Sequence, residues 1–366
     1  MKEAGALQAI RSTLSISSSV FEPQFNPIGC TPWVAQSALQ KAIRRGRTRI
    51  ALRAAATLLQ LAPERLWRRL ACVAFEDIGL GDFDVVALTT AAMAGKRARA
   101  FLGGEWKVAS YLTTRMAEAT KCRGADDLLL VAENHPEFAS PRLQLAFSTI
   151  PELNQILVSN KPLPIRALAA WFLLGTDRRP SPQLSRRRGD MAALVTALGS
   201  IMRPDLVEIA TEGYRRSGEV LPVFMALLEP QLQPEFATVH DDDMPPETMI
   251  GDVPGWSVDM YTRPGRAALA RLIEGSTDTA RWVRAHIPSR QRVNFLGAIV
   301  FRLEGQCCRQ RLRWEVADEL RRATDYECNG PHCPDATEIL GLVRADLGEL
   351  NAIRAELMSG SLANVG

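Results

Sequence analysis

Positively charged side chains are concentrated in one short stretch of the chain. Between residues 41 and 69 there are nine basic residues and a single acid, Glu64. Basic side chains at this density suit contact with the phosphates of a nucleic-acid backbone. The candidate contacts are Lys41, Arg44, Arg45, Arg47, Arg49, Arg53, Arg68 and Arg69. The alternative is a solvated face whose charge is neutralised by acids elsewhere in the chain.

A second segment carries the opposite charge. Residues 217–262 contain nine acids and neither lysine nor arginine. Carboxylates beside a histidine can hold a divalent metal, which would permit hydrolysis of a phosphodiester or a nucleotide. The residues for such a site are His240, Asp241, Asp243, Asp252 and Asp259. Because three consecutive aspartates do not all point one way, we favour a solvated loop or an intramolecular partner of the basic segment.

Cysteines near the C-terminus offer a possible zinc site. Cys328, His332 and Cys333 flank a Gly-Pro turn, and Cys307 and Cys308 precede them. The usual pair of zinc-binding cysteines with two residues between them is missing. We therefore favour plain thiols and expect no metal or cofactor. Seven cysteines in a chain without a secretory signal indicate reduced thiols and a cytoplasmic location.

The sequence lacks the usual signatures of an enzyme. A phosphate-binding loop needs a glycine-rich run that ends in Gly-Lys-Ser/Thr. The single Gly-Lys pair, Gly95-Lys96, is followed by Arg97 and has no upstream glycine at the right spacing. No nucleophile motif accompanies the four histidines. We therefore expect neither ATP hydrolysis nor Ser/Cys hydrolase chemistry.

Hydrophobic residues with helical spacing run through most of the chain and predict an all-α, bundle-like protein. Pro32 and Pro63 stand where helices begin, and Gly46 stands where one ends. The predicted parts are an irregular arm (1–31), a collar-type helical domain (32–175), an Arg/Pro-rich linker (176–190) and a second helical domain (191–366) with an acidic loop (233–262).

One part of the chain resembles a known family. The runs SALQKAIR (37–44) and LWRRLACVAFEDIGLGD (66–82) resemble the helical region that follows the ATPase core in the RarA/MgsA family of clamp-loader-like AAA+ proteins. The resemblance covers residues 33–160, and its motif residues are Glu76, Asp77, Gly79 and Asp82. It implies collar and oligomerisation helices without the motor. The same residues also fit a plain turn, with Gly79 left-handed and Asp82 capping the next helix.

Together these patterns predict a non-catalytic accessory factor in DNA replication, repair or mobile-element maintenance. We expect it to form homo-oligomers and to contact DNA, a replication protein or a single-strand-binding protein. The metal-dependent hydrolase and a protein-interaction scaffold are the alternatives. No apolar run is long enough to span a membrane, so we expect no membrane partner.

Overall fold

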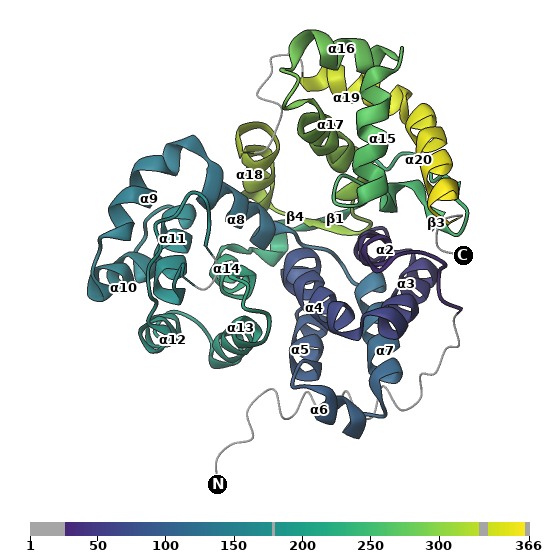
Figure 1. Ribbon diagram of the computed structural model, residues 1–366. Helices are drawn as coiled ribbons and strands as arrows, with labels where there is room; N and C mark the ends of the chain where they lie inside the picture. Colours follow the sequence, from purple (N-terminus) through teal and green to yellow (C-terminus); the bar gives the residue numbers. More distant parts are fainter. Residues whose placement is uncertain (1–25, 178–179, 329–335, 363–366) are drawn as a thin grey trace. The chain divides into compact units, whose positions relative to one another are not determined.

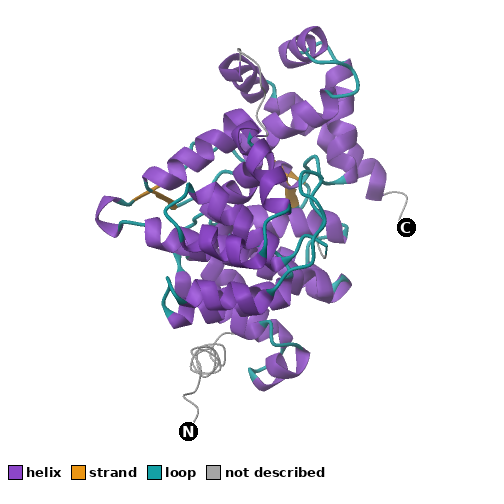
Figure 2. Cartoon of the chain, turned by 90° about the vertical axis from the view of Figure 1, so that its left-hand side faces the viewer, coloured by secondary structure: helices purple, strands orange, loops and turns teal. Residues whose placement is uncertain are grey.

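The computed structural model describes residues 26–177, 180–328 and 336–362. Helix accounts for 71% of the structure and strand for 3%, which confirms the predicted all-α fold. Figure 2 shows the predominance of helices over the few short strands. None of the helices in these three ranges combines the length and the apolar composition that crossing a membrane requires.

The chain forms two compact units, and each is assembled from separate stretches of sequence. Among the described residues, unit 1 comprises 67–240 and 310–328, and unit 2 comprises 26–66, 241–309 and 336–362. The predicted linker 176–190 lies within unit 1, where the Thr176 N–H donates to the Arg187 carbonyl at 2.9 Å. The chain is therefore not divided into two domains at residues 176–190, as the sequence predicts.

Unit 1 is built around α8, α11 and α14, which contact one another. Residues 167–174 of α11 and the whole of α14 are buried, as expected for helices that are apolar on every side. The α-helices of the unit are α4 (Pro63–Val73, whose first four residues belong to unit 2), α5 (Phe83–Ala92), α6 (Lys96–Phe101), α7 (Glu105–Glu118), α8 (Gly124–Asn134), α9 (Ala139–Ala146), α10 (Ile150–Val158), α11 (Leu163–Leu174), α12 (Met191–Gly199), α13 (Pro204–Ser217), α14 (Leu221–Leu228) and α18 (Glu315–Ala323). Shorter elements are the π-helices η1 (Ala74–Ile78) and η8 (Thr324–Cys328), the 3₁₀ turns η2 (Gly79–Gly81), η3 (Pro136–Phe138), η4 (Glu229–Gln231) and η5 (Pro234–Phe236), and the antiparallel strands β1 (Thr238–His240) and β4 (Arg311–Arg313).

Unit 2 joins the N-terminal helix pair to the last third of the chain. Its α-helices are α2 (Pro32–Arg44), α3 (Thr48–Leu61), α15 (Arg263–Glu274), α16 (Asp278–His286), α17 (Arg292–Val300), α19 (Ala336–Ala345) and α20 (Leu347–Leu362). A small hairpin of β2 (Met249–Ile250) and β3 (Val253–Pro254), the 3₁₀ turn η6 (Gly255–Ser257) and the π-helix η7 (Phe301–Gly305) complete it. Helices α15, α16, α17, α19 and α20 share one apolar core, and α2 packs against α3 and η6. Figure 1 labels the α-helices of this unit and strand β3.

Local sequence signals explain where several helices begin. Thr31 caps α2 and Pro32 occupies its first position, while Pro63 opens α4. The Asp82 carboxylate accepts the Val85 N–H at 3.1 Å and so caps α5, as the sequence predicts. Gly79 has a φ of +47°, and a side chain there would meet the Cys122 carbonyl at 2.9 Å. Only glycine fits this close approach.

Candidate functional site

The eight predicted nucleic-acid contacts do not share one environment. Lys41, Arg44 and Arg45 are buried, Arg47, Arg49 and Arg68 are exposed, and Arg53 and Arg69 are half-buried. Arg68 and Arg69 also belong to unit 1, while the other six belong to unit 2. The prediction of a single basic face is therefore corrected, because Lys41, Arg44 and Arg45 do not reach solvent.

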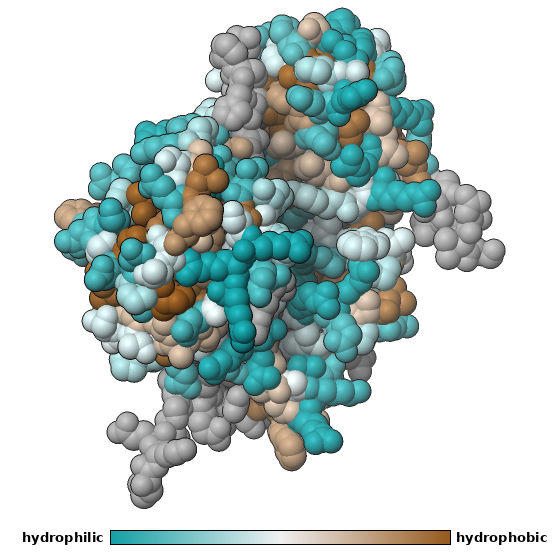
Figure 3. All heavy atoms as spheres, turned by 60° about the vertical axis from the view of Figure 1, so that its left-hand side comes forward, coloured by the Kyte–Doolittle hydropathy of each residue, from teal (hydrophilic) through white to brown (hydrophobic). Residues whose placement is uncertain are grey.

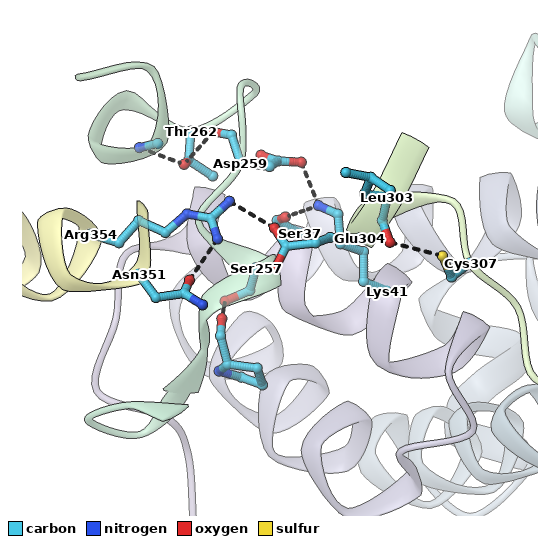
Figure 4. Close-up of polar contacts among 12 residues, drawn as sticks. Ser37, Lys41, Ser257, Asp259, Thr262, Leu303, Glu304, Cys307, Asn351 and Arg354 are labelled. Atoms are coloured by element: carbon cyan, nitrogen blue, oxygen red, sulfur yellow. Dashed lines mark hydrogen bonds and ion pairs between the residues drawn. The ribbon is translucent and has the colours of Figure 1, made fainter. Parts of the chain in front are cut away.

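Lys41 forms a buried ion pair. Lys41 lies on α2 and its partner Asp259 lies in the segment just before α15. Lys41 is only 3% exposed. The Nζ atom donates to Ser37 Oγ at 2.6 Å and to the carboxylate of Asp259, which is 5% exposed (Figure 4). Burial lowers the pKa of Lys41, and the Asp259 charge opposes this effect. Because Lys41 is buried with these partners, its charge is used inside the fold and is not available to contact a phosphate backbone.

Arg44 and Arg45 bind the end of a helix. Arg44 donates to the Gly305 carbonyl at 2.6 Å, and Arg45 donates to the Glu304 carbonyl at 2.9 Å. These carbonyls belong to η7, which continues α17, so the guanidinium groups lie at the negative end of that helix. The rings of Phe301 and Trp256 lie 5.7 and 5.3 Å from the two guanidinium carbons.

A second buried ion pair ties the C-terminal helix to the same region. Arg354 of α20 donates to the Glu304 carboxylate at 3.0 Å and to Asn351 Oδ1 at 2.8 Å. Both charged side chains are almost completely buried. We call the six charged residues of this region the buried charge network. Its members are Lys41, Arg44, Arg45, Asp259, Glu304 and Arg354.

The acidic segment pairs with basic side chains of the same unit. In addition to the Asp259 pair, Glu247 accepts two bonds from Arg47 at 3.0 and 3.1 Å, and Asp252 lies 3.2 Å from Arg53. Asp243 pairs instead with Arg344 of α19 at 2.5 Å. The sequence left open whether the acidic segment is the partner of the basic one, and for three ion pairs it is.

This arrangement does not support a metal-dependent hydrolase. The carboxylates of Asp243, Asp252 and Asp259 each form an ion pair with a different basic side chain. The Asp242 carboxylate accepts the Cys308 N–H at 2.8 Å. Within the described ranges no three His, Cys, Asp or Glu side chains are grouped so that they could hold a metal. Cys328 is half-buried, while His332 and Cys333 lie outside the described residues.

The motif residues Glu76 and Asp77 form an ion-pair cluster inside unit 1. The guanidinium group of Arg123, the residue that precedes α8, binds Asp77 and Asp126 and lies 3.3 Å from Glu76. Asp77 is completely buried on the π-helix η1. Burial also raises the pKa of the neighbouring Asp127 to about 6, although Arg123 and Arg311 oppose the shift. These contacts connect η1 to the start of α8.

Comparisons with protein-family models, curated proteins and solved structures give no match for this chain.

An element that the sequence interpretation overlooked has exposed cations beside an exposed aromatic ring. Lys96 and Arg97 of α6 are exposed, and Phe101 at the end of the helix is 88% exposed. Arg97 and Phe101 are four residues apart, so they share a helix face. The stretch 85–104 contains no acid. In the sequence this element is marked by the run Lys96-Arg97-Ala-Arg99-Ala-Phe101, of which only Lys96 and Arg97 were considered above, as a pair that does not complete a phosphate loop.

Other residues fix α6 to unit 1. Arg99 stacks over the Trp67 ring at 3.9 Å and donates to Glu105 at 2.7 Å. Trp67 in turn donates to the same carboxylate at 3.1 Å, and Leu102 is buried in an apolar cluster with Leu88. The helix is therefore held on one side, while Lys96, Arg97 and Phe101 remain exposed to solvent.

Proposed function

We propose that this protein is a non-catalytic accessory factor in DNA transactions that contacts single-stranded nucleic acid through α6. The observation that carries the proposal is the exposed Phe101 with Arg97 on the same helix face and Lys96 beside it. Proteins that bind single strands combine cations for the phosphates with aromatic rings on which bases stack. Among the described residues, neither Lys96 nor Arg97 has an acidic partner.

The basic segment 41–69 contributes less to this proposal than the sequence suggested. Its exposed Arg47 and its half-buried Arg53 are paired with Glu247 and Asp252, which reduces the positive potential that would attract a polyanion. The resemblance of residues 33–160 to the RarA/MgsA family supports a role in DNA replication or repair. The helix α6 lies within this range.

The test is binding of a fluorescent single-stranded oligonucleotide at several salt concentrations. We expect Lys96→Gln/Arg97→Gln to make the slope of log K against log salt shallower by about 1.4, because each phosphate contact to a single strand contributes about 0.7. Phe101→Ser should weaken binding by roughly 5- to 150-fold, since one base stack is worth about 1–3 kcal/mol, while the slope stays unchanged.

Two exposed residues far from α6 in the sequence provide matched controls. Arg290→Gln removes one exposed cation, and Phe236→Ser removes an aromatic ring that is also exposed. Neither change should alter affinity or slope. A wild-type protein that binds no oligonucleotide at low salt, or controls that lose as much affinity as the α6 variants, would refute the proposal.

A further inference from the structure

An exposed tryptophan in unit 2 carries a cation on its ring. Trp33, the second residue of α2, is 56% exposed. A single exposed apolar side chain is ordinary, and Figure 3 shows brown hydrophobic residues scattered among teal ones on the face that it draws. Trp33 differs through its neighbour, because the guanidinium carbon of Arg65 lies 3.9 Å from the centroid of its ring. Arg65 belongs to the first turn of α4 and, like Trp33, to unit 2.

The contact with Arg65 covers one face of the indole. A cation at this distance is attracted by the negative potential over the ring. Trp33 keeps more than half of its surface in water although this face is covered, so the opposite face of the ring is open to solvent. An open aromatic face is a surface on which an unpaired base can stack.

The stacked guanidinium group of Arg65 keeps its donors. Its N–H groups lie in the guanidinium plane, so stacking leaves them able to bind an acceptor such as a phosphate in bidentate fashion. Among the described residues no acidic side chain pairs with Arg65. The neighbouring acid Glu64 is exposed, and residues one position apart on a helix do not face each other. An anion from another molecule would supply the acceptor.

The backbone in front of the ring is fixed. The Thr31 side chain caps α2, and the Thr57 hydroxyl of α3 accepts the Ile28 N–H at 2.7 Å. The Asn26 carbonyl accepts the Nε–H of Arg53 at 3.1 Å. These bonds hold the segment before α2 against α3. A ring on such a backbone loses little conformational freedom when a ligand binds to it.

An apolar protein surface is the competing occupant of this place. Leu61 at the end of α3 is 54% exposed and would also be available to such a partner. Burial under an apolar surface would leave the Arg65 donors without an acceptor, which costs free energy. A nucleotide satisfies both neighbours, because its base stacks on the ring and its phosphate accepts from the guanidinium group.

We propose that Trp33 and Arg65 form a second contact for single-stranded nucleic acid, in which a base stacks on the open indole face and Arg65 binds the adjacent phosphate. The inference deepens the proposed function and rests on it, since the ligand class is the same. The residues are different, because α6 belongs to unit 1.

The test is binding of a fluorescent oligothymidylate by the full chain at several salt concentrations. Trp33→Ser should weaken binding roughly 5- to 150-fold, as the loss of one base stack does, and leave the slope of log K against log salt unchanged. Arg65→Gln should make the slope shallower by about 0.7. Arg65→Lys keeps the charge and should restore the slope, but it lacks the planar fork and should bind more weakly than the wild type.

Two neighbouring exposed residues of unit 2 provide matched controls. Glu64→Gln removes a charge without removing a donor, and Leu61→Ser removes an apolar side chain without removing a ring. Neither should weaken binding, and all variants should keep the wild-type circular dichroism spectrum. Equal losses for Trp33→Ser and Leu61→Ser would show that apolar contact rather than stacking holds the ligand, and would overturn the inference.

Variants of the two contacts distinguish this inference from the proposed role of α6. If Phe101→Ser loses affinity and Trp33→Ser keeps it, the second contact is refuted and the role of α6 stands. If only Trp33→Ser loses affinity, the second contact is supported and the role of α6 is refuted. A wild-type protein that binds no oligothymidylate at low salt refutes both.

Discussion

Replacing Lys41 by methionine is expected to lower the free energy of unfolding by about 3–5 kcal/mol, the cost of leaving one partner of a buried ion pair alone. Asp259 would keep its buried carboxylate without the Nζ that compensates it. Methionine has nearly the same length as lysine and fills the same space, so the loss reports on charge. Urea unfolding followed by far-UV circular dichroism measures it.

Two further variants make this result specific. Lys41→Met/Asp259→Asn removes both charges and keeps an acceptor for the Tyr261 N–H, so it should recover much of the lost stability. Arg47→Gln breaks an ion pair whose arginine is 52% exposed, and it should cost no more than about 1 kcal/mol. Equal losses for Lys41→Met and Arg47→Gln would show that the Lys41 pair is not buried in solution.

Asp127→Asn is expected to stabilise the protein at neutral pH. Burial raises the pKa of Asp127 from 3.8 to about 6, so the folded state binds its proton more tightly than the unfolded chain does. For an acid with a raised pKa, stability falls as pH rises from about 4 to about 6. A difference of about two pKa units, at 1.36 kcal/mol each, corresponds to roughly 3 kcal/mol above this window.

Asparagine stays neutral at every pH and should escape this loss. The variant should match the wild type near pH 4 and exceed its stability above about pH 6 by an amount that no longer grows. Urea midpoints across this range measure the difference. Asp278→Asn is the control, since Asp278 and its partner Arg281 are both exposed. A pH-independent difference for Asp127→Asn would mean that Asp127 ionises normally in the fold.

Local patterns were sufficient to predict the helical fold class and several helix starts. Pro32, Pro63 and Asp82 mark helix starts through their own backbone and side-chain chemistry, and the structure places helices at all three. The division into units was not predictable in this way. It depends on pairs such as Lys41 with Asp259, which are 218 positions apart. No periodicity in either segment shows which distant segment will cover it.

Local sequence patterns were also insufficient to predict the surroundings of the candidate site. Lys41, Arg44 and Arg45 have i, i+3, i+4 spacing, which puts them on one helix face but does not show whether water or protein covers it. Their burial depends on the acidic segment and on η7, which lie far along the chain. Phe101 was missed for the converse reason, because a sequence does not show which aromatic residues remain outside the core.

The division of unit 2 among distant segments also bears on how the protein is synthesised. The pair formed by Lys41 and Asp259 cannot form until a further 218 residues have been translated, which takes roughly 10–40 s at 5–20 residues per second. During this time α2 and α3 leave the ribosome with their cations uncompensated and an apolar face uncovered. The nascent helix pair therefore exposes a basic, amphipathic surface until residues 241–309 have been made, and we expect the yield of folded protein to be lower than stability alone suggests when synthesis is slowed.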